Sequence, residues 1–117
     1  MWEVEFTDEF GDWWDTLQEE DQKAIARSVN LLKNLGPNLK FPQSSSVVQS
    51  RHGNMRELRS QSQGDALRTF YAFDPRRVAI LLVGGAKTSG DRFYDELVPK
   101  ADKIYDQYLK ELEAEKK

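Results

Sequence analysis

The sequence predicts an α+β fold in which a small, largely antiparallel sheet has helices packed on one face and is open on the other. Three changes in the apolar pattern lead to this prediction. Residues 2–6 alternate with the period of a strand, residues 10–35 follow the period of a helix, and residues 55–85 return to strand-like runs before a last helical stripe. The predicted order is therefore β-α-α-β-β-β-α, and 117 residues suit one domain spanning residues 1–117.

The first half of the chain predicts one strand and a helical hairpin. Residues 2–6 alternate apolar and acidic side chains, and Thr7 can cap the helix that follows. The apolar stripe of that helix consists of Phe10, Trp13, Trp14 and Leu17, which we interpret as core residues rather than a binding surface. A second helix ends at Gly36, and the short connection predicts that the two helices are antiparallel. Residues 38–50 lack periodicity and predict an exposed connection, in which Val47-Val48 can pair briefly at a sheet edge.

Three strands are predicted between residues 55 and 85. The first, at residues 55–61, turns Leu58 inward and places Glu57 and Arg59 on the opposite face. The second, at residues 65–73, places Arg68 and Phe70 on one face. The third contains the unbroken apolar run 78–83, which is typical of a central strand covered on both sides. A loop at residues 87–92 leads to the final helix, which we expect Pro99 to kink or restart.

Positive charge is concentrated in one part of the chain. Residues 51–92 hold seven of the eight arginines, and their 8 basic and 4 acidic residues give a local charge of +4. The same count gives −5 for residues 1–50 and −2 for residues 93–117. The total of −3 would argue against a nucleic-acid partner, but recognition depends on local potential. Guanidinium groups match phosphate geometry, so we expect the predicted sheet to contact the backbone of RNA.

Several classes of protein are excluded or disfavoured. The sequence has no cysteine, which rules out disulfides and thiolate metal sites. Its first ten residues are acidic and lack the pattern of a signal peptide, and no apolar run approaches the roughly 20 residues of a membrane span. We therefore expect a cytoplasmic protein.

An ordered set of features lies between residues 55 and 97. It begins with Glu57-Leu58-Arg59, continues with Arg68 opening a strand that contains Phe70-Tyr71, and ends with an apolar strand, a Gly–Lys turn and an aromatic residue. Each motif alone is common, but the ordered set at these spacings resembles the RelE/ParE superfamily of toxins from bacterial toxin–antitoxin pairs. It is most similar to the HigB-like branch of phage-derived, Gp49-like proteins. With the β-α-α lead-in, the resemblance covers nearly the whole chain.

This resemblance implies a toxin that is a ribosome-dependent endoribonuclease and cuts mRNA in the ribosomal A site. It implies that the 2′-hydroxyl of the RNA attacks the adjacent phosphate, with neither metal nor cofactor. It also implies an antitoxin that masks the active surface, which we expect to be a helix-turn-helix protein from the same operon. Arg59 and Arg68 match the basic residues of the family's sheet. Lys87 matches the basic residue after the last strand, and Tyr94 matches the aromatic residue of the C-terminal segment. Members of the superfamily often have lysine or histidine where this chain has Glu57, which leaves the general base open.

The chemistry of such a cleavage constrains the roles of these residues. Internal transesterification needs a base, an acid and cations that stabilise the charge of the phosphorane. Arginine is a poor base but clamps phosphate oxygens well, so Arg59, Arg68 and Lys87 are the electrostatic candidates. Tyr94 and His52 are the main candidates for moving a proton, and Glu57 is a further one.

Further candidates concern contact with RNA, and plainer interpretations stand beside them. The candidates for RNA binding are Arg56, Phe70, Arg76 and Arg92, of which Phe70 can stack an unpaired base. His52 is more simply explained as a surface residue in a turn, and Arg76 as a solvated charge of a hairpin. Tyr94 is equally explained as a core aromatic residue. Two arginines on one strand face repel each other unless an anion is expected there, although charge alone permits an anion other than RNA.

Two other classes of function remain open. A ParE-like toxin shares the fold but poisons DNA gyrase by binding and does not cleave RNA. A degraded toxin would be an inert module that only binds its antitoxin. The set of basic residues and Tyr94 favours the nuclease, because a gyrase binder needs no phosphate-centred pocket.

Overall fold

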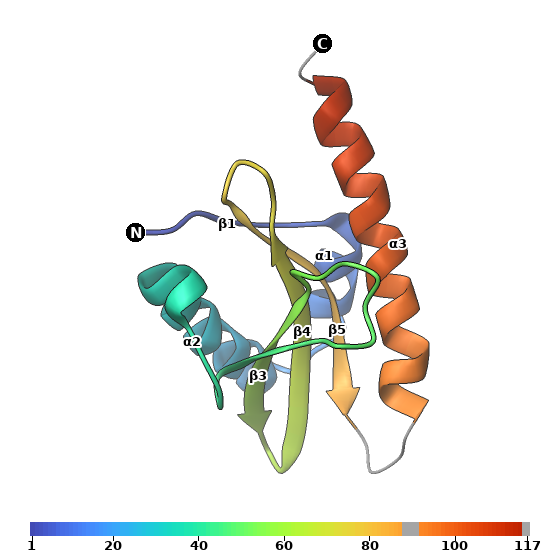
Figure 1. The fold of residues 1–117 in the computed structure, drawn as a ribbon. Coiled ribbons are helices and arrows are strands. Elements are labelled where there is room, and N and C mark those ends of the chain that lie inside the picture. Colours follow the sequence, from blue (N-terminus) through green and yellow to red (C-terminus); the bar gives the residue numbers. More distant parts are fainter. Residues whose placement is uncertain (88–91, 116–117) are drawn as a thin grey trace.

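A computed structural model describes residues 1–87 and 92–115 (Figure 1). It contains five strands, three α-helices and one turn of 3-10 helix. In chain order these are β1 (Val4–Phe6), α1 (Asp8–Asp15), α2 (Glu19–Leu35), η1 (Gly36–Asn38), β2 (Ser44–Ser46), β3 (Arg56–Ser62), β4 (Asp65–Phe73), β5 (Ala79–Lys87) and α3 (Arg92–Glu115). The α+β class is confirmed. The expected loop at residues 87–92 falls partly on residues 88–91, which lie outside the described part of the chain.

All strands belong to one sheet with the order β1-β5-β4-β3-β2. The three neighbouring pairs from β5 to β2 are antiparallel, and β1 alone pairs in parallel, with Val4 opposite Ala79. The sheet is therefore largely antiparallel, as predicted. The added strand β2 falls in the stretch expected to be an exposed connection, where its backbone pairs with β3.

Both ends of the helical hairpin follow from local chemistry. Thr7 caps α1, because its Oγ1 accepts a hydrogen bond from the backbone N of Phe10 at 3.1 Å. Gly36 ends α2 with a φ of 56°, and a Cβ at this position would lie 2.4 Å from the indole of Trp2. Glycine is needed there for both the backbone conformation and the close approach.

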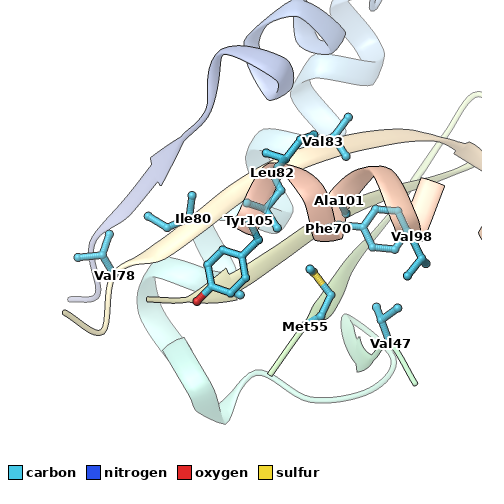
Figure 2. Close-up of a cluster of buried hydrophobic side chains, with 12 residues drawn as sticks. Val47, Met55, Phe70, Val78, Ile80, Leu82, Val83, Val98, Ala101 and Tyr105 are labelled. Atoms are coloured by element: carbon cyan, nitrogen blue, oxygen red, sulfur yellow. The ribbon is translucent and has the colours of Figure 1, made fainter. Parts of the chain in front are cut away.

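The sheet is covered on both faces, which differs from the expectation of an open face (Figure 1). On one face α1 and α2 pack against strand residues such as Leu58 and Tyr71. On the other face α3 packs over Phe70 and Ile80 (Figure 2). The physical reason is that β5 turns apolar side chains to both sides, and the apolar stripe of α3 buries the second set.

The last helix is longer and more continuous than expected. α3 extends through Pro99, although proline removes one backbone donor and was expected to kink or restart the helix. Its buried side chains include Val98, Ala101 and Tyr105, which lie on both sides of the proline in sequence and anchor the helix to the sheet (Figure 2). Within residues 1–87 and 92–115, no helix combines the length and apolar character needed to cross a membrane.

Candidate active site

Four side chains from four elements gather at one end of the sheet. Glu57 comes from β3, Arg68 from β4, Lys87 from the end of β5 and Tyr94 from the first turns of α3. We call this set the Glu57–Tyr94 cluster. The register explains the meeting of the strand residues: Arg68 lies directly opposite Arg59 and diagonally across from Glu57, so all three share one face.

The carboxylate of Glu57 is the centre of the cluster. Tyr94 donates its hydroxyl proton to Oε1 of Glu57 at 2.6 Å, and Ser45 donates from Oγ to Oε2 at 2.8 Å. Nε of Arg68 lies 3.5 Å from the same Oε1. Glu57 and Arg68 are 7% and 6% exposed, so this ion pair is largely shielded from water and less screened than a surface pair.

The environment of Tyr94 fixes its protonation state. Burial raises the pKa of the Tyr94 phenol, and its hydrogen bond to the Glu57 carboxylate raises that pKa further, which outweighs the opposite effect of Arg68. The phenol therefore keeps its proton at neutral pH and can act as an acid. Nζ of the exposed Lys87 lies over the Tyr94 ring, 5.2 Å from its centroid, which places a cation close to the phenol.

A shallow hollow of about 270 Å³ opens beside Arg68. It is lined by Pro42, Gln43, Arg59, Ser60, Gln61 and Arg68. Arg68 donates from Nη1 to the carbonyl of Leu67 at 3.1 Å, but its Nε is buried without a hydrogen-bond partner among the residues that the structure describes. A buried donor without a partner is unfavourable, so an anion that reached Arg68 would satisfy part of the guanidinium.

A larger groove lies away from this chemistry. It measures about 610 Å³ between α1 and α2 and is lined mainly by apolar side chains, among them Phe6, Phe10 and Trp14. Its charged lining consists of Asp15 and Lys33. The groove lacks the acid–base pairing found at Glu57 and Tyr94. We therefore place the candidate chemistry at the Glu57–Tyr94 cluster, whose Arg68 also lines the smaller hollow.

The structure does not bring His52 to the cluster. Nε2 of His52 lies 2.7 Å from Oδ1 of Asp106, and its ring packs on Tyr105 with 4.7 Å between centroids. Asp106 is twelve residues after Tyr94 on α3, which corresponds to about 18 Å along a helix. His52 therefore fastens the loop before β3 onto α3, a structural role that differs from both the catalytic residue and the surface turn residue considered from the sequence.

Phe70 cannot stack an RNA base in this structure, and that expectation is wrong. It is 0% exposed and stacks on Phe93 with 6.1 Å between centroids, beneath α3 (Figure 2). The alternation correctly gives the face on which Phe70 lies. The side chain is buried because α3, which begins 22 residues later at Arg92, covers this part of the face.

The other three arginines predicted to contact RNA make no hydrogen bond to the Glu57–Tyr94 cluster among the described residues. Arg76 binds Asp74, Glu5 and the Tyr108 hydroxyl, and thus stabilises the turn between β4 and β5. The side chains of Arg56 and Arg92 also have local partners: Arg56 donates to Ser44 and Ser46, and the 90% exposed Arg92 lies 3.9 Å from Glu96.

Two features were missed or underweighted from the sequence. Glu57 was only a secondary candidate, yet its carboxylate joins Tyr94, Arg68 and Ser45. The period of two, which puts Glu57 on the face of Arg59, was the available signal. Ser45 had no signal, because a run of serines predicts a loop. In the described ranges 1–87 and 92–115, no three His, Cys, Asp or Glu side chains are placed to hold a metal ion.

Comparison with known proteins supports the resemblance seen in the sequence. The model of the family described as "Phage derived protein Gp49-like (DUF891)" matches residues 12–106. The chain belongs to this Gp49-like family. It is also a homologue of two proteins of Mycobacterium tuberculosis (strain ATCC 25618 / H37Rv), named "Putative toxin HigB2" and "Putative toxin HigB3".

The extent of these matches differs. HigB2 is 37% identical over 103 residues, which are 86% of this chain and 51% of that protein, so the chain spans about half the length of this relative. HigB3 is 37% identical over 98 residues, which are 83% of this chain and 84% of that protein.

A solved structure shares the fold of this Gp49-like chain. It is the archaeal RelE–RelB complex from Pyrococcus horikoshii OT3, which matches with a TM-score of 0.55 and 15% identity over 76% of this chain and 98% of the other. At this identity the comparison establishes a RelE-like fold.

Proposed function

We propose that this chain is the toxin of a toxin–antitoxin pair and that it cleaves mRNA on the ribosome. Membership of the Gp49-like family, the two HigB relatives and the RelE-like fold support the first part. One observation carries the second: the 2.6 Å hydrogen bond from Tyr94 to Glu57, with Arg68 beside the same carboxylate. An acid and a base joined to a cation are the groups that RNA transesterification requires.

The proposed reaction uses each member of the Glu57–Tyr94 cluster. The Glu57 carboxylate accepts the proton of the 2′-hydroxyl while the 2′-oxygen forms a bond to phosphorus. The bond between phosphorus and the 5′-oxygen then breaks, and Tyr94 donates its proton to that oxygen. The hydrogen bond between Glu57 and Tyr94 returns the proton to the phenolate. The products are a 2′,3′-cyclic phosphate and a 5′-hydroxyl, and the enzyme is restored.

The two cations have different places in this scheme. Arg68, which is held against Glu57, donates to the non-bridging oxygens of the phosphate. Lys87 is exposed beside the Tyr94 ring and stabilises the phenolate and the phosphorane as charge develops. In the proposed reaction, no step is assigned to a metal or cofactor, because the 2′-hydroxyl of the substrate is the nucleophile.

The proposed partners are mRNA in the ribosomal A site, in the cytoplasm, and an antitoxin from the same operon that binds DNA through a helix-turn-helix. The antitoxin neutralises the toxin by covering the face of the sheet that carries Arg59, and the exposed Lys87, with acidic side chains. A small chain has little surface with which to hold RNA unaided, which supports dependence on the ribosome.

The test is to induce expression and to map the 5′ ends of transcripts. We expect growth arrest and new 5′-hydroxyl ends within translated codons. Arg68→Ala should reduce cleavage by about 10²- to 10³-fold, as for the loss of one donor to a transition-state oxyanion, while antitoxin binding persists. Because Arg68 is buried, Lys87→Ala serves as a second variant that changes only an exposed side chain.

A second candidate function is favoured by one observation. Arg68 is only 6% exposed and already has a carboxylate partner, as expected of a structural ion pair in an inert module that binds an antitoxin. Unaltered transcripts with retained antitoxin binding would support this function. Unaltered transcripts together with gyrase-dependent DNA breaks would indicate a ParE-like toxin.

A further inference from the structure

Phe41 is an exposed aromatic residue that the proposed reaction does not use. It lies between η1 and β2 and is 70% exposed, whereas Phe70 is 0% exposed. The guanidinium carbon of Arg59 lies over its ring, 4.9 Å from the centroid. A flat cation above a flat ring forms a two-layered π surface, to which a third flat group can add.

The segment around Phe41 is fixed by its neighbours. Leu39 is 2% exposed and anchors the start of the turn in the core. The backbone N atoms of Gln43 and Ser44 both donate to the carbonyl of Lys40 at 3.1 Å, and the backbone N of Arg59 donates to the carbonyl of Gln43 at 2.9 Å. The turn thus holds Phe41 on the outside of a defined backbone, and binding there loses little chain entropy.

Arg59 connects this ring to the hollow beside Arg68. The lining of the hollow contains two guanidinium groups and no carboxylate among the described residues, which suits an anionic ligand. Gln43 and Gln61 also line it, and each amide can donate and accept hydrogen bonds at the edge of a base. The hollow therefore combines recognition of phosphate with recognition of a flat, polar-edged group.

The spacing of Arg59 and Glu57 along β3 determines where a ligand beside Arg59 would lie relative to the Glu57–Tyr94 cluster. Arg59 and Glu57 are two residues apart on one face of β3, which corresponds to about 7 Å. In the proposed reaction, a nucleotide next to the scissile phosphate would therefore lie beside Arg59, whose guanidinium covers the ring of Phe41.

We propose that Phe41 and Arg59 form a stacking platform for an unpaired RNA base adjacent to the scissile phosphate, with Gln43 and Gln61 at the edge of that base. This inference rests on the proposed function and deepens it, because it adds a base subsite to the phosphate site. The platform takes over the stacking role that the buried Phe70 cannot have. Stacking tolerates every base, whereas the two glutamine amides give the subsite its preference among bases.

The test uses ribosomes programmed with an RNA whose A-site codon carries 2-aminopurine and 2′-O-methyl groups. The fluorescence of 2-aminopurine falls on stacking. This RNA lacks the 2′-hydroxyl nucleophile, so binding is measured without cleavage. We expect quenching by the wild-type chain, about tenfold weaker binding for Phe41→Ala, and near wild-type binding for Phe41→Trp. Phe6→Ala is the matched control, because Phe6 is 66% exposed but lines the groove between α1 and α2.

Each outcome decides the inference separately from the proposed function. Equal quenching and affinity for Phe41→Ala and Phe6→Ala overturn it, as does a wild-type chain that fails to quench the probe. Loss of antitoxin binding by Phe41→Ala with unchanged RNA binding also overturns it and assigns Phe41 to a protein interface. Phe41-dependent quenching in a chain that leaves translated transcripts intact supports the platform and refutes the nuclease.

Discussion

Replacing Tyr94 with phenylalanine removes one oxygen from the candidate active site and keeps the ring. The lost hydroxyl is the donor to Oε1 of Glu57 at 2.6 Å. Because the acceptor is the buried carboxylate of Glu57, we expect the free energy of unfolding to fall by about 1.5–3 kcal/mol, the usual contribution of a hydrogen bond to a charged group. Loss of a positioned general acid lowers a rate by about 10²- to 10⁴-fold, so cleavage should fall far more than stability.

Tyr108→Phe is the control for this substitution. Tyr108 is on the same helix and also donates to a carboxylate, Oδ2 of Asp74 at 2.8 Å. It is fourteen residues after Tyr94, which is about 21 Å along α3. The chemical change is identical, but only one of the two hydroxyls is next to Arg68.

The assay is cleavage of a reporter mRNA in a cell-free translation system, with unfolding in urea measured on the same samples. Tyr94→Phe should lose cleavage while Tyr108→Phe retains it. Because the pKa of the Tyr94 phenol is raised above its ordinary value of about 10, deprotonation of this group should not lower the wild-type rate between pH 7 and 9. Equal rates for the two variants would refute the assignment of Tyr94 as the acid.

Two further predictions concern stability. Burial alone would raise the pKa of Asp74, but hydrogen bonds from Val78, Tyr108 and Arg76 outweigh it and leave the pKa below its ordinary value. The stabilisation from Asp74 is therefore present above the unfolded pKa of about 4, and it is lost as the pH falls through the folded pKa. Asp74→Asn should lower the Tm at pH 7. At pH 3 the Tm of this variant should differ less from that of the wild type. Gly84→Ala places a Cβ 2.2 Å from the ring of Trp13 and should destabilise the fold by about 1–3 kcal/mol, whereas Gly53→Ala meets nothing within 4 Å and should be neutral in urea unfolding. A constant Tm difference across pH, or equal effects of the two alanines, would contradict these arguments.

Local patterns predict most of the fold because they report which side chains are buried. The strand predicted at residues 65–73 has the bounds of β4, with Leu67 and Tyr71 on one face and Phe70 on the other. The parallel pairing of Val4 with Ala79 joins residues 75 positions apart, and periodicity carries no information about such partners. β2 has no apolar pattern at all, and backbone pairing with β3 defines it.

The candidate site was predicted less completely, for a related reason. Alternation places Glu57, Arg59 and Arg68 on one face, as the structure does. It does not tell which part of that face α3 covers, so neither the burial of Phe70 nor the buried contact between Glu57 and Arg68 follows from the alternation. His52 was chosen because it is the only histidine, but its neighbours on α3 decide its role.

The placement of α3 has a consequence during protein synthesis. This helix supplies Tyr94 and covers Phe70, and it packs on strands that are translated before it. A nascent chain that has not reached residue 92 would display the apolar surface of β4 and β5 and would lack the phenol that the proposed cleavage requires. Truncated products of translation should therefore aggregate readily and be susceptible to proteolysis. They should also be unable to cleave mRNA in the cell that makes them.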